Sequence, residues 1–175
     1  MEAVDAILLI GTVGVGKNTV LMEIGDALDA DDEPYALLDL DWLAWVRPAD
    51  HAAVSVQQIL VENLTHACRT FRRAGVRRLV MARAVDAASD VEGIRSALGS
   101  SVRLLVVQLT AAPEVVAERL RGRDRGERLA EHLEQADAFA ARVEPAQLGA
   151  VAVATDHRDV LSVAQEVLAT AGWRS

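Results

Sequence analysis

A glycine-rich stretch near the start of the chain has the residue types of a phosphate-binding loop. It reads Gly11-Thr12-Val13-Gly14-Val15-Gly16-Lys17-Asn18-Thr19 and fits the Walker A spacing G-x-x-x-x-G-K. Glycines allow backbone N–H groups to close around a phosphate, and a lysine adds a mobile positive charge. We predict that nucleotide phosphates bind here. The residues predicted to bind them are Gly11, Gly14, Val15, Gly16, Lys17, Asn18 and Thr19.

Asn18 departs from this pattern, which has serine or threonine after the lysine. In such loops that hydroxyl is a direct ligand of Mg²⁺, and the longer amide does not place its oxygen identically. Two interpretations follow. Either Mg²⁺ is held mainly through water and the carboxylates of Asp39 or Asp41, or Asn18 weakens the metal site, which we favour. Asn18 and Asp39 are the predicted metal-site residues.

Two carboxylates, Asp39 and Asp41, end an apolar run that begins at Tyr35. Carboxylates at this position can hold Mg²⁺ through water or accept a proton from a substrate hydroxyl. Strand alternation would direct both to the same side, with Asp41 reaching further into the crevice. The alternative is a pair of solvated loop acids that cap a helix.

Two further residues are predicted to bind the substrate. Trp42 follows Asp41 and, with Trp45, would wall an apolar pocket, although packing in the core is an equally good interpretation. Arg83 follows the third apolar run, where an ordinary loop is the alternative.

A segment rich in arginine and glycine extends from Arg119 to Arg128. Guanidinium groups bind phosphate in a bidentate manner, and glycines allow a segment to open and close. The alternative is a solvated, charged helix end. Because the segment follows the helix after the fourth predicted strand, we predict a lid at about residues 119–142.

These motifs lie within a regular alternation of strand and helix patterns. The predicted strands cover residues 6–10, 35–41, 76–82, 102–109 and 150–154. The predicted helices cover residues 19–28, 52–73, 89–98, 114–121, 129–143 and 159–171. The alternation predicts one α/β domain over residues 1–175, a three-layer sandwich with a five-stranded parallel sheet. Right-handed crossovers place the functional loops at the C-terminal edge of the sheet.

Composition excludes several classes of function. The net charge of −8 argues against binding to a nucleic-acid polymer, and no apolar run is long enough to span a membrane. The single Cys68 rules out a disulfide framework or a cysteine-based zinc site. The N-terminus lacks the basic flank of a signal peptide, so we expect a cytoplasmic protein. The oligomeric state is left open, with a homodimer among the options.

The motifs resemble those of the P-loop small-molecule and nucleoside-monophosphate kinases, which include adenylate, shikimate, gluconate, adenylylsulfate and chloramphenicol kinases. Thr19 holds the place of the threonine in the G-K-G-T loop of adenylate kinases, and Arg119 and Arg123 match their R-x-x-G-R motif. The resemblance implies that these arginines contact the nucleotide and its phosphates. Asp41 matches the acid that adenylylsulfate and chloramphenicol kinases use as the base for the substrate hydroxyl, although Leu40 replaces the glycine of that motif.

The sequence therefore favours an ATP-dependent kinase that transfers the γ-phosphoryl group to a hydroxyl of a small molecule, with ATP and Mg²⁺ as cofactors. Lys17, Asp41 and Arg123 are the predicted catalytic residues. One alternative is a nucleotide-binding regulator or pseudokinase without transfer, which Asn18 supports. Another is a hydrolytic ATPase acting on a protein partner, but the third strand carries Ala82-Arg83-Ala84 where a catalytic acid would be needed.

Overall fold

The centre of the molecule is a five-stranded, all-parallel β-sheet. The structure is a computed structural model that describes residues 5–51, 53–85, 87–140 and 148–174. The strand order is β2-β3-β1-β4-β5. The strands are β1 (Ala6–Ile10), β2 (Tyr35–Asp39), β3 (Arg78–Arg83), β4 (Leu104–Thr110) and β5 (Val151–Ala154). The predicted fold class is confirmed.

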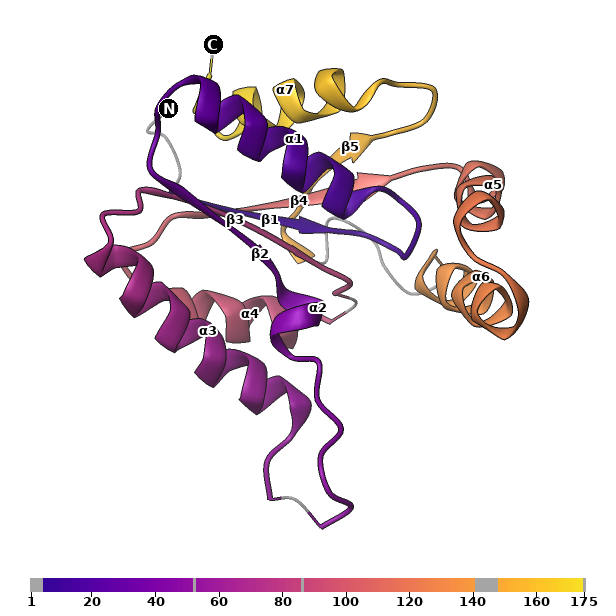
Figure 1. Ribbon diagram of the computed structural model, residues 1–175, viewed down its shortest axis with the longest axis horizontal. Coiled ribbons are helices and arrows are strands. Elements are labelled where there is room, and N and C mark those ends of the chain that lie inside the picture. Colours follow the sequence, from indigo (N-terminus) through magenta and orange to yellow (C-terminus); the bar gives the residue numbers. More distant parts are fainter. Residues whose placement is uncertain (1–4, 52, 86, 141–147, 175) are drawn as a thin grey trace.

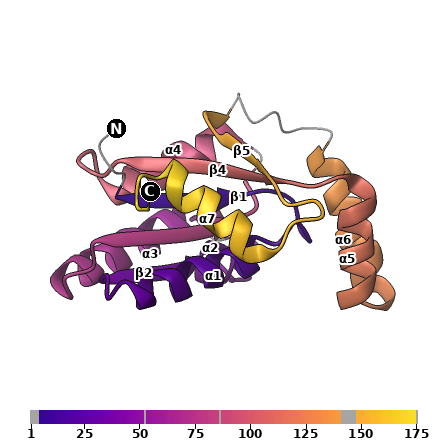
Figure 2. The ribbon, with the colours of Figure 1, turned by 90° about the horizontal axis from the view of Figure 1, so that it is seen from above.

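Helices cover both faces of this sheet, as Figure 1 shows. Helices α1 (Lys17–Ala30) and α7 (Val160–Thr170) pack together on one face, and α3 (Val56–Arg73) and α4 (Ala88–Leu98) pack together on the other. The short helix α2 (Leu40–Leu43) follows β2. Helices α5 (Pro113–Arg123) and α6 (Gly126–Ala140) lie side by side beyond the sheet (Figures 1 and 2). No helix among the described residues is both long and apolar enough to cross a bilayer.

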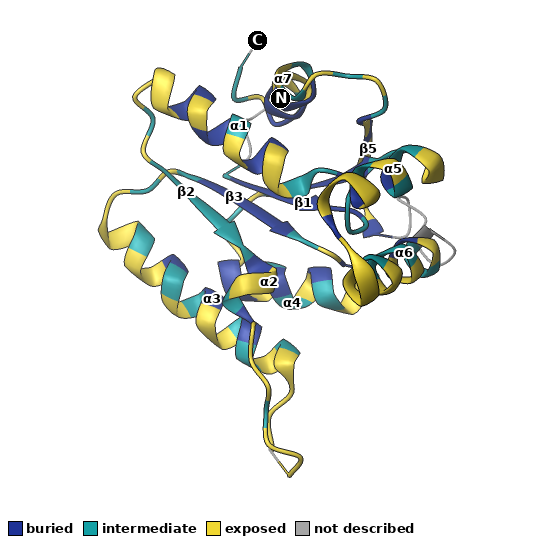
Figure 3. Ribbon diagram, turned by 45° about the vertical axis from the view of Figure 1, so that its right-hand side comes forward, coloured by how far each residue is buried: buried dark blue, intermediate teal, exposed yellow. Residues whose placement is uncertain are grey.

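The core consists of two apolar layers separated by the sheet. All five residues of β1 are fully buried because the strand is central and covered on both faces. Ile7 and Leu9 pack with α1 and α7, whereas Leu8 and Ile10 pack with α3 and α4. Figure 3 shows the buried strands β1 and β3 between helices whose outer surfaces are exposed. The central strand β1 thereby holds the glycine-rich loop that follows it in a fixed position.

The pair α5–α6 has a small apolar cluster of its own. Val116 and Leu120 of α5 pack with Ala136 of α6, and Val13 of the glycine-rich loop packs against them. The segment predicted as a lid therefore comprises the end of α5 and the whole of α6, and its role as a lid stays a prediction. Residues 141 and 142 of the predicted lid lie outside the described residues.

The prediction that β2 extends to Asp41 is wrong. The Asp39 carboxylate accepts hydrogen bonds from the N–H groups of Asp41 (2.9 Å) and Trp42 (3.2 Å), so Asp39 caps α2 and the strand ends there. Strand alternation thus does not relate the two acids. Similarly, the helix predicted from residue 52 begins at Val56, because Ser55 and Gln58 form a capping box.

Candidate functional site

The glycine-rich loop has a conformation that only glycine adopts easily. Gly14 and Gly16 have φ angles of 83° and 104°, in the left-handed region. A Cβ at Gly11 would lie 2.7 Å from the carbonyl oxygen of Leu109, and a Cβ at Gly14 would lie 2.8 Å from the side chain of Leu120. The sequence pattern of this loop thus reflects backbone geometry and close approach by β4 and α5.

Lys17 is the first residue of α1, and its ammonium group lies inside the loop. The Nζ atom donates hydrogen bonds to the carbonyl oxygens of Gly11 (2.9 Å) and Thr12 (3.0 Å). Burial lowers the pKa of Lys17 to about 8. The negative charges of Asp41 and Asp39 act in the opposite direction and raise this pKa, whereas the positive charge of Arg123 lowers it further. A bound anion in the loop would relieve the cost of keeping this ammonium charged.

The start of α1 provides further groups that suit an anion. The first N–H groups of a helix have no partner within the helix, and the helix dipole places partial positive charge at this end. Thr12 Oγ1 is buried and makes no hydrogen bond among the described residues. The loop, the helix start and Lys17 together fit the phosphates of a nucleotide.

Asn18 and Asp39 are joined by a short hydrogen bond. Asn18 Nδ2 lies 2.6 Å from Asp39 Oδ2, and Asp39 Oδ1 already accepts the two N–H groups at the start of α2. Direct binding of a metal by Asp39 would compete with these bonds. Among the described residues, no group of three or more His, Cys, Asp or Glu side chains is arranged to hold a metal. These donors fit a Mg²⁺ ion bound mainly by phosphate oxygens and water.

Asp41 lies in the first turn of α2, at the end of the sheet where the loop lies. Its Oδ1 is 3.9 Å from Arg83 Nε, and Arg83 is itself held by a 2.9 Å hydrogen bond to Gln57. The Asp41 side chain is 49% exposed. Desolvation and the charge of Asp39 raise the pKa of Asp41, against the effects of Lys17, Arg83 and a hydrogen bond with the Ala84 backbone. Asp41 is therefore a stronger base than an ordinary aspartate.

A cavity of about 360 Å³ lies between the glycine-rich loop and α6. The loop contributes Thr12 and Val13, and the end of β3 contributes Ala84, whose backbone hydrogen-bonds Asp41. The residues that line it from α6 are Glu134, Gln135, Ala138 and Phe139. None of these α6 residues was predicted from the sequence. Their i,i+4 spacing is the only sequence signal that they share one helix face.

Arg119 joins three separate parts of the site. Its guanidinium donates hydrogen bonds to the carbonyl oxygen of Val15 (3.1 Å) and to Oγ1 and the carbonyl oxygen of Thr155 (both 2.9 Å). Thr155 is buried and follows β5. Arg119 therefore connects α5 to the loop and to the end of β5, and its predicted contact with the nucleotide stays a prediction.

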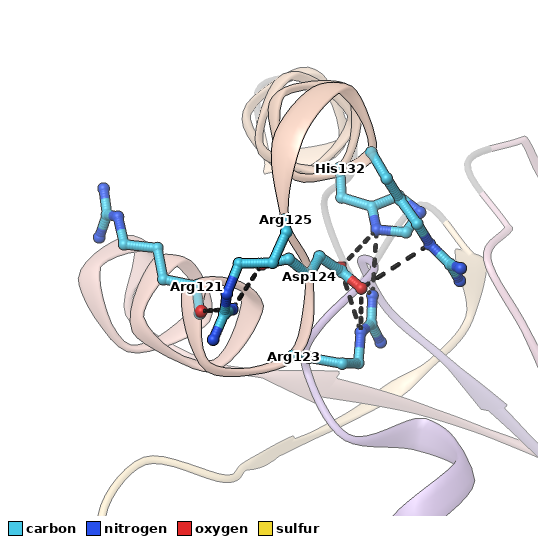
Figure 4. Close-up of polar contacts among 6 residues, drawn as sticks. Arg121, Arg123, Asp124, Arg125 and His132 are labelled. Carbon is cyan, nitrogen blue, oxygen red and sulfur yellow. Dashed lines mark hydrogen bonds and ion pairs between the residues drawn. The ribbon is translucent and has the colours of Figure 1, made fainter.

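Arg123 is held by a buried acid, Asp124, that the sequence analysis missed (Figure 4). Nε and Nη2 of Arg123 donate to the Asp124 carboxylate at 3.1 and 2.8 Å, and His132 Nδ1 lies 2.7 Å from the same group. Arg128 is a further ion-pair partner at 3.7 Å. The hydrogen bonds from Arg123 and His132 hold the pKa of Asp124 far below its usual range. Asp124 thus fixes Arg123, whose positive charge lowers the pKa of Lys17.

Trp42 and Trp45 lie on the surface beside Asp41. Their exposed fractions are 69% and 76%, and their rings stack with centroids 5.1 Å apart. The interpretation that they pack in the core is wrong. The buried residues of this segment are Leu40 and Ala44 instead.

Comparison with known proteins supports the fold. No protein-family model and no curated protein sequence matches the chain. Solved structures do match. The tunicamycin resistance protein of Deinococcus radiodurans has 16% identity and a TM-score of 0.65, with 97% of this chain and 96% of that chain covered. A gluconokinase from Sinorhizobium meliloti 1021 has 19% identity and a TM-score of 0.64, with 99% and 94% covered.

A sugar kinase from Janibacter sp. HTCC2649 is also similar, with 14% identity, a TM-score of 0.63 and coverage of 95% of this chain and 93% of that chain. Each of these likenesses extends over nearly the whole of both chains. At identities of 14% to 19% they establish the fold. The chain therefore has the fold of the P-loop small-molecule kinases.

Proposed function

We propose that this protein is an ATP-dependent kinase that phosphorylates a hydroxyl group of a small molecule. The observation that carries the proposal is the convergence of Lys17 and Asp41. They come from different elements, yet each lies close enough to influence the pKa of the other, and Asp41 meets Ala84 at the margin of the cavity. The similarity to a gluconokinase and a sugar kinase supports the same class of reaction.

Each side chain has a separate task in this proposal. Lys17 and the N–H groups of the loop hold the outer phosphates, with Thr19 near the α-phosphate. Asp41 orients the acceptor hydroxyl and accepts its proton, a role that its raised pKa favours. Arg83 steadies Asp41 through their ion pair. Arg123, held by Asp124, neutralises charge on the phosphoryl group during transfer.

Mg²⁺ supplies charge neutralisation of the phosphates in this reaction. Asn18 occupies the sequence position after the lysine, where phosphate-binding loops have their metal ligand. Since Asn18 Nδ2 donates to Asp39, its amide oxygen is directed away from that carboxylate and stays available as a ligand. In the proposal, Asn18 and Asp39 contact the hydrated ion from this side of the loop.

The test is phosphoryl transfer to a panel of small alcohols with ATP and Mg²⁺, detected by mass spectrometry of the products. We expect Asp41→Asn to reduce transfer about a hundredfold or more, because proton transfer and orientation typically contribute this much. Asp26→Asn, at an exposed position on α1, is the matched control and is expected to behave like the parent. Equal transfer by Asp41→Asn and the parent would remove Asp41 from the mechanism.

The second candidate function is nucleotide binding without transfer. The Asn18–Asp39 hydrogen bond favours it, since Asp39 Oδ2 accepts from Asn18 while Oδ1 accepts from the start of α2, and both carboxylate oxygens are thus engaged. A kinase and a nucleotide-binding protein without transfer are distinguished by comparing the parent with Asn18→Thr. ATP binding by the parent, with transfer appearing only in Asn18→Thr, would identify a binding protein.

A further inference from the structure

Exposed apolar side chains are concentrated between α2 and the start of α3. Eight large hydrophobic side chains among the described residues are exposed. Five of them belong to this one segment: Trp42, Trp45, Val46, Val54 and Val56. Scattered exposed apolar residues are normal on a protein surface, whereas tryptophan is enriched at binding surfaces.

The two tryptophans are held outward by the way α2 is built. Leu40 and Ala44 occupy its inner face and are buried in the layer beneath α3 and α4. The backbone is fixed by hydrogen bonds from the Ala44 N–H to Leu40 and from Asn63 Nδ2 to the Leu43 carbonyl oxygen (3.1 Å). The rings therefore form a preformed aromatic platform, defined here as Trp42 and Trp45, that contributes nothing to the core.

This platform adjoins the proposed catalytic base. Trp42 is the next residue after Asp41 on α2. Asp41 forms an ion pair with Arg83, and the positive charge of Lys17 lowers the pKa of Asp41. A molecule whose flat body lies on the platform can place a hydroxyl at Asp41 with a short linker. Because Asp41 and Trp42 are consecutive residues of α2, the platform begins directly beside the proposed catalytic base.

The size of the platform favours a small ligand over a protein partner. A buried tryptophan contributes about 150–250 Å², so at exposures of 69% and 76% the pair offers about 220–360 Å². A stable protein interface buries about 800 Å² on each partner. An aromatic ring can extend the existing stack of two indoles, whereas an open-chain polyol has little flat apolar area to bury against it.

We infer that the acceptor is an aryl alcohol, with its ring on Trp42 and Trp45 and its hydroxyl at Asp41. The inference rests on the proposed kinase function and specifies its class of substrate. It also assigns Trp45 to the acceptor site. The aryl ring supplies binding energy, and Asp41 acts only on the hydroxyl.

The test measures binding without nucleotide, so that it is independent of transfer. 2-Naphthylmethanol and sorbitol are mixed at equal concentration with the protein, and saturation-transfer NMR reports which protons contact it. We expect saturation of the naphthyl protons in the parent and a loss of about fivefold or more in Trp42→Ala and in Trp45→Ala. Phe substitutions at the same positions should retain most of the signal. Trp173→Phe, remote at the C-terminal end, should equal the parent.

Several results would overturn the inference. Equal naphthyl saturation in the parent and both Ala variants would do so, as would saturation of sorbitol alone. A change from dimer to monomer in the Ala variants, with unchanged NMR signals, would instead identify a self-association surface. Failure of the kinase proposal looks different: 2-naphthylmethanol would bind to the platform, but neither it nor any other alcohol of the panel would gain phosphate from ATP. Transfer to polyols only would keep the kinase and refute the aryl acceptor.

Discussion

Nucleotide binding by this protein should take up a proton at alkaline pH. In the free protein the pKa of Lys17 is lowered from 10.5 to about 8 because the ammonium is desolvated. Phosphates beside Nζ would favour the charged form and return the pKa to about its ordinary value. The pKa is then higher in the complex than in the free protein. Affinity is therefore full below about pH 8 and falls as the pH rises from there toward 10.5.

The size of the effect follows from these two pKa values. Between about pH 7.5 and about pH 9.5 the dissociation constant for ADP should rise about 20-fold, or about 1.8 kcal/mol. At about pH 9, binding should take up about 0.9 proton, against about 0.1 at pH 7. The phosphates of ADP are already ionised over most of this range and add little.

Isothermal titration of ADP in two buffers with different ionisation enthalpies counts these protons directly. Lys17→Arg is the matched control, because a guanidinium stays charged and should bind ADP with no pH dependence in this range. The chain has one lysine, so the ε-amino signal has a single source. An ADP affinity that stays constant to pH 9.5 in the parent would refute the proposed contact between Lys17 and the phosphates.

Three other substitutions test separate parts of the site. Asn18→Thr should raise ATP turnover about tenfold, which corresponds to about 1.4 kcal/mol of transition-state stabilisation, because it restores a hydroxyl ligand and releases Asp39. The measurement is ATP turnover against Mg²⁺ concentration for both proteins, and superimposable curves would contradict this prediction. Asp124→Asn should lower transfer about tenfold or more and leave ADP affinity nearly unchanged, because Arg123 loses its fixed partner. An unchanged rate would show that Asp124 is only structural. In the parent, transfer at saturating ATP should increase with pH as Asp41, with its raised pKa, loses its proton; Asp41→Asn should abolish that limb of the pH–rate profile.

The fold could be predicted because its signals are local. The apolar runs of β1 and β4 mark strands covered on both faces, and helix patterns separate them. Connections in such sheets are right-handed, so the end of β1 and the end of β2 had to meet at one edge. The glycine-rich loop followed from spacing alone, since Gly14 and Gly16 need left-handed backbone.

The missing parts of the site depend on contacts distant in the sequence. In the sequence, an acid among arginines is typical of a solvated segment. Asp124 is nevertheless buried, because α6 folds back beside α5 and places His132 within hydrogen-bonding distance of it. The cavity residues on α6 face the loop through tertiary packing. In α2, the pattern of apolar residues could not show whether Leu40 and Ala44 or the two tryptophans face the core, because all are apolar and the helix is one turn long.

Everything proposed for this chain depends on the loop from Gly11 to Thr19 binding the phosphates of a nucleotide. The direct measurement is thermal unfolding of the parent and of Lys17→Ala, each with and without ATP or ADP. At a hundredfold excess over the dissociation constant, a ligand adds about 2.7 kcal/mol, which corresponds to about 5–10 °C for a domain of this size. We expect that shift in the parent and the loss of most of it in Lys17→Ala. No shift in the parent, or an equal shift in both proteins, would contradict the assignment of the loop.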